Sequence, residues 1–163
     1  MAGALAVLLL SVGCSDQTEG SAVASPQAPQ DVWQLADRLV ELVPLTADTF
    51  ESLLGTPLTP DEQSPVRLNG GPVEFSPSLQ VTSSAIAVID GTWSFAYVEV
   101  APAPCITKDM VRDHYPAAEL TSAPTGHSLY ETAVWSTSYD WGSLGFGIRE
   151  KEHCLTTISL HRA

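Results

Sequence analysis

A stripe of apolar residues with helical period runs through the segment between residues 31 and 44. Six apolar side chains recur at intervals of three and four positions: Val32, Leu35, Ala36, Leu39, Val40 and Val43. This spacing places them on one face of an α-helix. Asp31 supplies an N-cap with Gln34 three residues later, and Pro44 ends the pattern. The segment is therefore predicted to form an amphipathic helix with one buried face.

Capping residues predict two shorter helices. The first begins after Thr46 and ends at Gly55, because glycine readily adopts the left-handed conformation found at helix C-termini. The second begins after Thr107 and ends before Pro116. The residues between the first of these helices and position 65 include three prolines and are expected to form a rigid loop.

The apolar period changes to two in the remaining segments, as is typical of β-strands. Asp90-Gly91 is the dipeptide that favours a type I′ hairpin turn, so it is predicted to join strands 79–89 and 92–100. Trp93, Phe95 and Tyr97 are expected on one face of the second strand. Four further segments have strand character: 66–75, as a short hairpin or an edge, and 128–138, 142–150 and 154–161.

The order of these elements predicts the fold class. Thr46 and Thr107 each open a Thr-x-Asp helix start, and each helix precedes an antiparallel meander. This order indicates two helix-plus-meander repeats, although the sequence identity between them is small. We expect an α+β two-layer sandwich in which the helices pack on one face of a curved antiparallel sheet. Residues 31–163 are expected to form this single domain.

The N-terminus has the pattern of an export signal. Residues 4–10 are all apolar, a run much shorter than the roughly 20 residues of a membrane-spanning helix. Small residues lead to Cys14, and residues 15–20 are polar, which argues against a buried N-terminal helix. The segment resembles the lipobox of bacterial lipoproteins. The resemblance implies a signal segment at 1–13, lipidation of Cys14 and a periplasmic, lipid-anchored protein. Residues 14–30 are expected to form a flexible tether.

Charge narrows the class of partner. The chain carries 19 acidic and 7 basic residues, for a formal net charge of -12. Within residues 1–66, Arg38 is the one basic residue beside nine acidic residues. Nucleic acids and anionic membrane surfaces both favour proteins rich in Lys and Arg. We therefore expect that the protein does not bind nucleic acid and that it contacts the membrane only through its lipid. The acidity favours a basic protein partner, or it serves solubility.

If Cys14 carries a lipid, Cys105 and Cys154 remain as a pair in an oxidising compartment. They are predicted to form a disulfide that ties the start of the third helix to the last strand. Cys154 shares a strand face with Ile158 and Leu160, so it is expected to face the core. The alternative, two free thiols that bind a metal, lacks the usual ligand spacing.

No motif of a known catalytic or cofactor site is present, and no cofactor is expected. The glycine-rich segment 142–147 lacks the dinucleotide-binding pattern, so Gly145 and Gly147 are read as allowing close packing or a bend. Acidic residues lie beside His114 and His153, in clusters that could bind a metal or transfer a proton. Neither cluster has an accompanying nucleophile, and solvated charged surfaces explain both better.

Aromatic residues are the more informative feature. Tyr139 and Trp141 flank Asp140 at a predicted turn, where stiff aromatic surface is typical of protein interfaces. These three residues are the predicted protein-binding site, with a carbohydrate-stacking surface as the alternative. Trp135, on the preceding strand, is expected to pack inward.

Residues 45–58 read Leu-Thr-x-x-Thr-Phe-x-x-Leu-Leu-Gly-x-Pro-Leu. This segment resembles the helix-to-loop region of the SmpA/OmlA envelope lipoproteins and of the β-lactamase-inhibitor-like fold. The resemblance covers some fifteen residues and implies a domain that binds proteins through an exposed sheet face. The predicted function is a non-catalytic inhibitor or toxin immunity protein. The alternatives are an envelope-assembly accessory lipoprotein and a small cell-wall hydrolase.

Overall fold

A computed structural model describes residues 28–163 of the chain. The predicted signal segment, Cys14 and nearly all of the predicted tether lie outside these residues. Of the described residues, 46% are in strands and 18% in helices. None of the helices in this range combines the length and the apolar character needed to cross a membrane.

The three helices of the described part of the chain begin and end close to their predicted capping residues. They are α1 (Val32–Glu41), α2 (Ala47–Leu54) and α3 (Lys108–His114). Asp31 accepts a 2.9 Å hydrogen bond from the backbone N–H of Gln34. Thr46 accepts one of 3.1 Å from Thr49, and Gly55 ends α2 with φ at 66°. Local capping chemistry therefore sets these boundaries.

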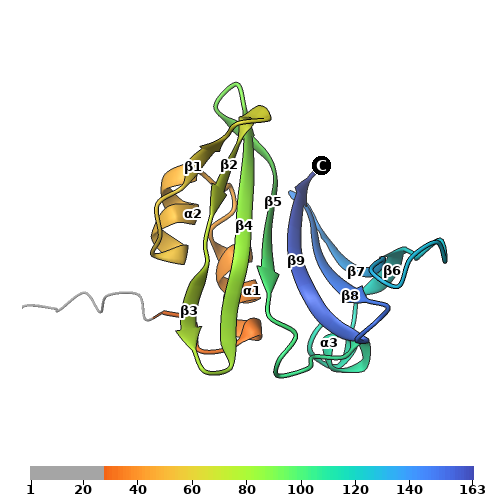
Figure 1. Cartoon of the computed structure of the whole chain (residues 1–163). Helices are drawn as coiled ribbons and strands as arrows, with labels where there is room; N and C mark the ends of the chain where they lie inside the picture. The colour runs from red at the N-terminus through yellow and green to blue at the C-terminus, as the bar shows by residue number, and fades with distance from the viewer. Residues whose placement is uncertain (1–27) are drawn as a thin grey trace, which may run out of the picture.

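Within residues 28–163, nine antiparallel strands form one sheet (Figure 1). They are β1 (Thr59–Asp61), β2 (Ser64–Gly70), β3 (Val73–Ser76), β4 (Leu79–Ile89), β5 (Thr92–Val100), β6 (Glu119–Ser122), β7 (Thr132–Tyr139), β8 (Gly142–Arg149) and β9 (Cys154–Arg162). Their order across the sheet is β1-β2-β4-β5-β9-β8-β7-β6, with β3 also paired to β4. Asp90 and Gly91 have φ values of 51° and 75°, and they connect β4 to β5 as predicted.

Three local predictions are corrected by the sheet. Residues 66–75 do not form a hairpin, because β2 and β3 both pair with β4 along the same edge. The expected proline-rich loop before residue 66 contains β1 and the start of β2, and β1 pairs with β2 through a register shift. Strand β6 was not predicted at all. Strands β1, β3 and β6 have only three or four residues and irregular pairing, so their sequences carry little of the alternation that marks a strand.

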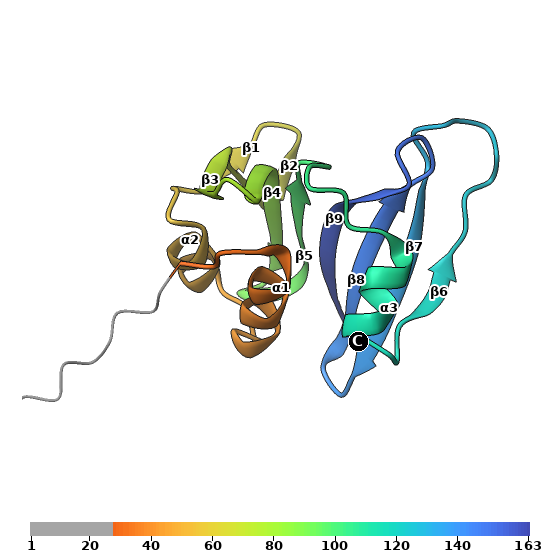
Figure 2. The ribbon, with the colours of Figure 1, turned by 90° about the horizontal axis from the view of Figure 1, so that it is seen from below.

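The predicted two-layer sandwich of helices on a sheet is wrong, because the fold is dominated by its sheet. Strands β5 and β9 pair along residues 95–99 and 157–161, and this pairing merges the two meanders into one nine-stranded sheet. The three helices have only ten, eight and seven residues. They are too short to form a layer that matches the sheet. Figure 2 shows α1 and α2 beside the β1–β5 half and α3 beside the other half.

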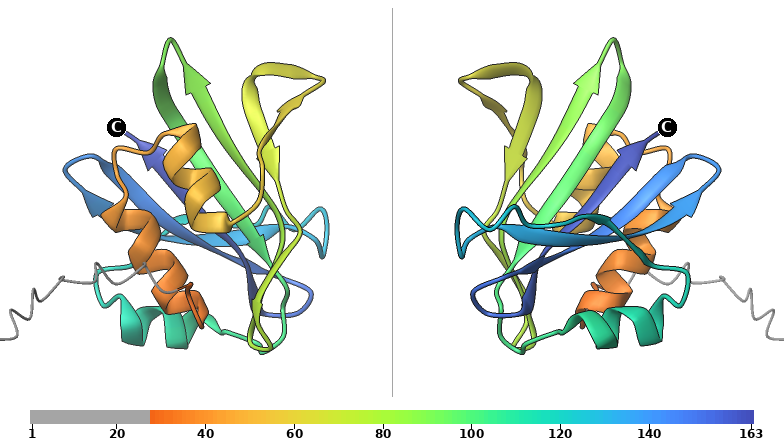
Figure 3. Two further views of the ribbon diagram at one scale, coloured as in Figure 1. Left: turned by 90° about the vertical axis from the view of Figure 1, so that its left-hand side faces the viewer. Right: turned by 90° about the vertical axis from the view of Figure 1, so that its right-hand side faces the viewer.

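The hydrophobic core lies between the helices and one face of the sheet. Its fully buried large side chains come from α1, α2 and the central strands: Leu35, Leu39, Phe50, Leu54, Ile86, Leu144, Phe146, Ile158 and Leu160. α1 and α2 lie on this side of the sheet (Figure 3). The opposite face carries Phe95, Tyr97 and His161 and is called the open face below.

Cys105 and Cys154 are joined by a disulfide with an S–S distance of 1.96 Å, as the sequence predicted. Cys154 is 6% exposed, whereas Cys105 lies at the surface just before α3. The expected face of Cys154 is wrong: a register shift puts Leu155, paired with Ile148, on the core face with Ile158, and Cys154 pairs with Arg149. Beside the bridge, the backbone N–H of Leu155 donates a 2.7 Å hydrogen bond to the carbonyl of Ile106. The start of α3 is thereby attached to β9.

Candidate functional site

The predicted binding residues lie together at the turn between β7 and β8. Tyr139 ends β7 and Trp141 directly precedes β8, and both side chains are half-buried. Their rings stack with centroids 5.0 Å apart and planes 10° apart. Trp141 also contacts Trp93 of β5, at a centroid distance of 6.0 Å. Asp140 is exposed at the tip of the turn.

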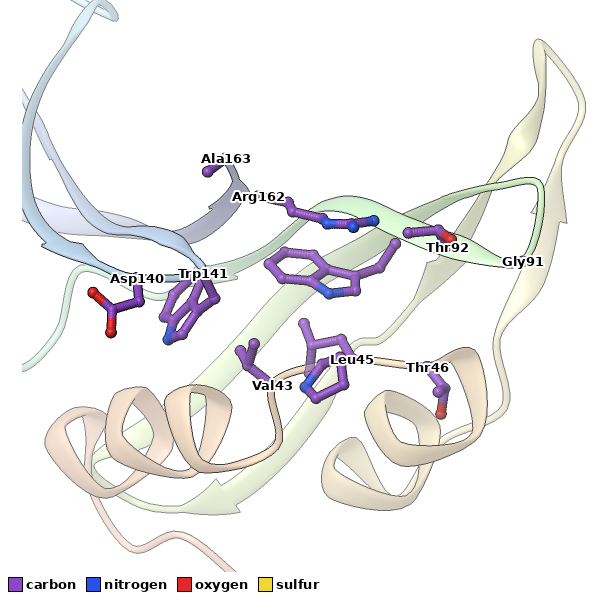
Figure 4. A pocket seen from close by; sticks show the side chains of 11 residues that line it. Val43, Leu45, Thr46, Gly91, Thr92, Asp140, Trp141, Arg162 and Ala163 are labelled. Atoms are coloured by element: carbon purple, nitrogen blue, oxygen red, sulfur yellow. The ribbon is translucent and has the colours of Figure 1, made fainter.

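Trp141 forms one wall of a surface hollow with a volume of about 680 Å³. Four separate segments line it: residues 43–46, 91–93, 140–141 and 162–163. Figure 4 shows Val43 and Leu45 on one side of the hollow and Arg162 on the other. The hollow is therefore assembled from the α1–α2 connection, two hairpin turns and the last residues of β9.

A β-bulge places Trp93 in this hollow. In the ladder between β4 and β5, Ala87 pairs with Phe95 but Val88 pairs with Trp93, so one extra residue lies between them. Trp93 is consequently turned into the core and is 4% exposed. Phe95 and Tyr97 point to the open face, where their rings are 6.5 Å apart and nearly parallel. The prediction that these three aromatic residues share one face is wrong.

Carboxylates lie in and near the hollow. Asp140 lines it and Asp90 directly precedes Gly91 in its wall, and both side chains are exposed. A third, Asp37 on α1, is close enough to Tyr139 that its charge adds to partial burial in raising the pKa of that phenol. Arg162 is the cationic side chain in the wall. Asp140 and Arg162 are thus the charged side chains in the lining, and two further carboxylates lie close to it.

A second aromatic group adjoins the turn and was missed in the sequence. Trp33 of α1 stacks on His114 of α3 with ring centroids 4.6 Å apart, and Tyr115 lies 4.8 Å from the buried ring of Phe146. Tyr115 donates a 2.6 Å hydrogen bond to Asp37. The one sequence signal for this group is that Trp33 widens the apolar stripe of its helix, which indicates that its side chain packs against another element. Nothing local indicates its partners, because they belong to the other half of the chain.

The two histidine clusters do not assemble a metal site. His114 stacks on Trp33 and lies 4.0 Å from a carboxylate oxygen of Asp37 on α1. Near His153, Glu152 lies 4.0 Å from the Arg149 guanidinium. Within residues 28–163, no group of three or more potential ligands is arranged to hold a metal ion.

The glycines of β8 allow close packing, as expected. A Cβ atom on Gly145 would lie 2.8 Å from the Ser159 hydroxyl oxygen, and one on Gly147 would lie 2.7 Å from a methyl carbon of Thr132. Both glycines therefore lie beneath neighbouring side chains on the open face. Trp135, on the adjacent strand β7, packs against the core with Arg112 5.5 Å from its ring centroid.

The arrangement at the β7–β8 turn suits binding by contact. It offers two stacked aromatic rings, a hollow with apolar walls and an exposed carboxylate at the turn. The chain was compared with models of known protein families, with characterised proteins and with solved structures, and none of them matched. The functional conclusion consequently rests on the chain's own residues.

Proposed function

We propose that this chain is a non-catalytic, exported lipoprotein that binds another protein in the bacterial periplasm. Its role is to occupy that protein, as an inhibitor or as immunity against a toxin. The observation that supports this proposal is the hollow at the β7–β8 turn, where Trp141 and Trp93 form an aromatic wall beside the exposed carboxylate of Asp140. Such a surface can receive an apolar side chain of a partner while its rim contacts basic groups.

The walls of the hollow are held in place before any partner arrives. The backbone N–H of Ala163 donates a 3.1 Å hydrogen bond to the carbonyl of Trp141, which connects the turn to the end of β9. Trp141 is further fixed between Tyr139 and Trp93. Since little side-chain freedom remains to be lost, ordering costs on binding are small. This rigidity supports a role as an interface anchor.

Electrostatics favour a basic partner. The chain has a formal net charge of -12, and the exposed carboxylates of Asp90 and Asp140 lie at the hollow. A negative field of this kind accelerates association with a cationic protein and is screened by salt over about 8 Å at physiological ionic strength. The same field disfavours nucleic acid and anionic membrane surfaces as partners.

The experiment measures binding kinetics with the partner, once genome neighbourhood and pull-down have identified it. We expect Trp141→Ser to raise the dissociation rate at least about tenfold, because desolvated aromatic anchors act after docking. Asp140→Asn with Asp90→Asn should instead lower the association rate, and added salt should remove that difference. Circular dichroism checks that each variant folds.

The matched control is Phe95→Ser on the open face, the surface that the β-lactamase-inhibitor-like resemblance implies. If Phe95→Ser raises the dissociation rate and Trp141→Ser does not, the interface lies on the open face instead of the hollow. If added salt does not change the association rate and Trp141→Ser does not change the dissociation rate, the proposed interface is wrong.

The lipid anchor is tested separately, because Cys14 lies outside the described residues. Replacing Cys14 with Ser should release the protein from membranes into the soluble periplasmic fraction. An unchanged membrane fraction would remove the anchor from the proposal without affecting the binding surface.

A further inference from the structure

Two consecutive apolar side chains stand out from the surface in the connection between β6 and β7. Leu129 is 67% exposed and Tyr130 is 66% exposed. They lie beside the Thr132 end of β7, whereas the Trp141 hollow lies beside its Tyr139 end. Strand geometry separates the two ends by roughly 24 Å. The pair therefore belongs to a surface distinct from the hollow.

The connection that carries this pair is held by Glu131. The carboxylate of Glu131 accepts hydrogen bonds of 3.0 Å from the N–H of Gly126 and 3.1 Å from that of His127. It also accepts a 2.8 Å bond from the Thr125 hydroxyl and one from the Thr125 backbone N–H. The Glu131 carboxylate thus holds residues 125–127 against the end of the same loop.

Backbone contacts fix the tip further. Lys151 donates its backbone N–H to the carbonyl of Leu129, and Glu150 donates to that of Glu131, each at 2.9 Å. The Lys151 ammonium lies 5.0 Å from the ring centroid of Tyr130 and 3.5 Å from its hydroxyl. The tip is therefore attached to the β8–β9 turn, and the aromatic ring has a defined neighbour.

Neither exposed side chain belongs to the core, so the fold itself does not explain them. A hollow of about 450 Å³ borders the loop, and its apolar walls include Leu120, Pro124 and Trp135. Leu120 is itself 49% exposed. Apolar surface is thus exposed at the loop tip and also at the edge strand β6. Exposed apolar surface that the fold does not cover marks interaction sites.

We propose that Leu129 and Tyr130 insert into an apolar pocket of a protein partner, at a second interface independent of the Trp141 hollow. A loop fixed in advance by Glu131 loses little entropy on insertion. The partner is a different protein, since two copies with net charge -12 repel each other. Lys151 is the cation beside Tyr130, but the net charge of -12 likewise disfavours an anionic membrane surface. A neutral or basic protein fits these constraints.

The test places a photo-crosslinking amino acid at Leu129 in the full-length chain, in the cells that produce it. The control position is Val66 of β2, which is 38% exposed and lies away from both the hollow and the loop. We expect an adduct with one protein from position 129 and none from position 66. Adducts with lipid or with a second copy would overturn the proposal in favour of those occupants, and the absence of an adduct would overturn it outright.

The crosslinked protein is then purified and its affinity is measured. Leu129→Ser and Tyr130→Ser should each weaken binding at least about tenfold, because both remove apolar area from a pocket. Val66→Ser should leave the affinity unchanged. If the loop variants bind as tightly as the original chain, the crosslink reflects proximity alone and the proposal is wrong.

Discussion

Tyr115 donates its phenolic hydroxyl to Asp37 through a hydrogen bond of 2.6 Å, across 78 residues of sequence. Tyr115 directly follows α3, and Asp37 lies on the solvent side of α1. The bond therefore connects the two halves of the chain on the helical side of the sheet. Strands β5 and β9 make the corresponding connection within the sheet.

Removing this hydroxyl should cost a modest part of the stability. Tyr115→Phe is expected to lower the free energy of unfolding by about 1 kcal/mol, because Asp37 remains partly hydrated in both proteins. Chemical denaturation measures the change. Tyr97→Phe is the matched control, since its hydroxyl on the open face makes no hydrogen bond within the described residues. Equal stabilities of the two variants would show that the bond contributes nothing.

The same residue predicts an alkaline dependence of stability. Burial, followed by the hydrogen bond to Asp37 and its charge, raises the pKa of Tyr115 far above its usual value. The unfolded chain releases this proton near pH 10, whereas the folded chain keeps it. The contribution of Tyr115 is thus complete below about pH 10 and is lost as the pH rises further. We expect denaturation above pH 10 to show a shrinking difference between Tyr115→Phe and the original chain; a constant difference would contradict the assignment.

The disulfide should make a large contribution. Cys105 and Cys154 are 49 residues apart, and closing a loop of that length stabilises the fold by about 4 kcal/mol in the chain-entropy model. Replacing both with Ser should lower the free energy of unfolding by this order. In a Cys14→Ser background, thiol labelling of the unfolded, unreduced chain should find no free cysteine. Two labelled thiols would show that the bridge does not form.

Two glycines with positive φ should respond differently to alanine. At Gly142, φ is 144° and a Cβ atom would lie 1.9 Å from the His161 carbonyl oxygen, so Gly142→Ala should cost about 3 kcal/mol or more. At Gly91, φ is 75° and a Cβ atom would meet nothing within 4 Å, so Gly91→Ala should cost only about 1 kcal/mol. Thermal unfolding compares them. Similar losses would show that backbone conformation alone accounts for both.

The structure of the loop between β6 and β7 should depend on the negative charge of the Glu131 carboxylate. Hydrogen bonds from Thr125, Gly126 and His127 lower the pKa of this carboxyl, so the ionised form holds the loop. Glu131→Gln should speed hydrogen exchange of the Gly126 and His127 amides by about tenfold or more. In the original chain, protection should persist above the usual carboxyl pKa and be lost as the pH falls through the lowered value. Glu119→Gln, an exposed carboxyl nearby, should leave exchange unchanged.

The helix boundaries and the β4–β5 hairpin could be predicted from the sequence because their determinants are local. Asp31, Thr46 and Thr107 bond to backbone groups three residues away, and Asp90-Gly91 adopts its own turn. The cysteine pairing followed from the number of cysteines once Cys14 was assigned to the lipid. Likewise, Tyr139, Asp140 and Trp141 are close in space because they are consecutive in a turn.

The number of strands in one sheet, and hence the fold class, was decided only by tertiary structure. Strand β5 pairs with β9, and nothing in the sequence of either strand indicates that the other is its partner. The hollow likewise needs four segments that are distant in the chain, and Trp93 reaches it through a bulge that the alternating pattern conceals. Side-chain periodicity reports which face of an element is apolar. It cannot report which other element covers that face, because that depends on how all the apolar surfaces are buried together.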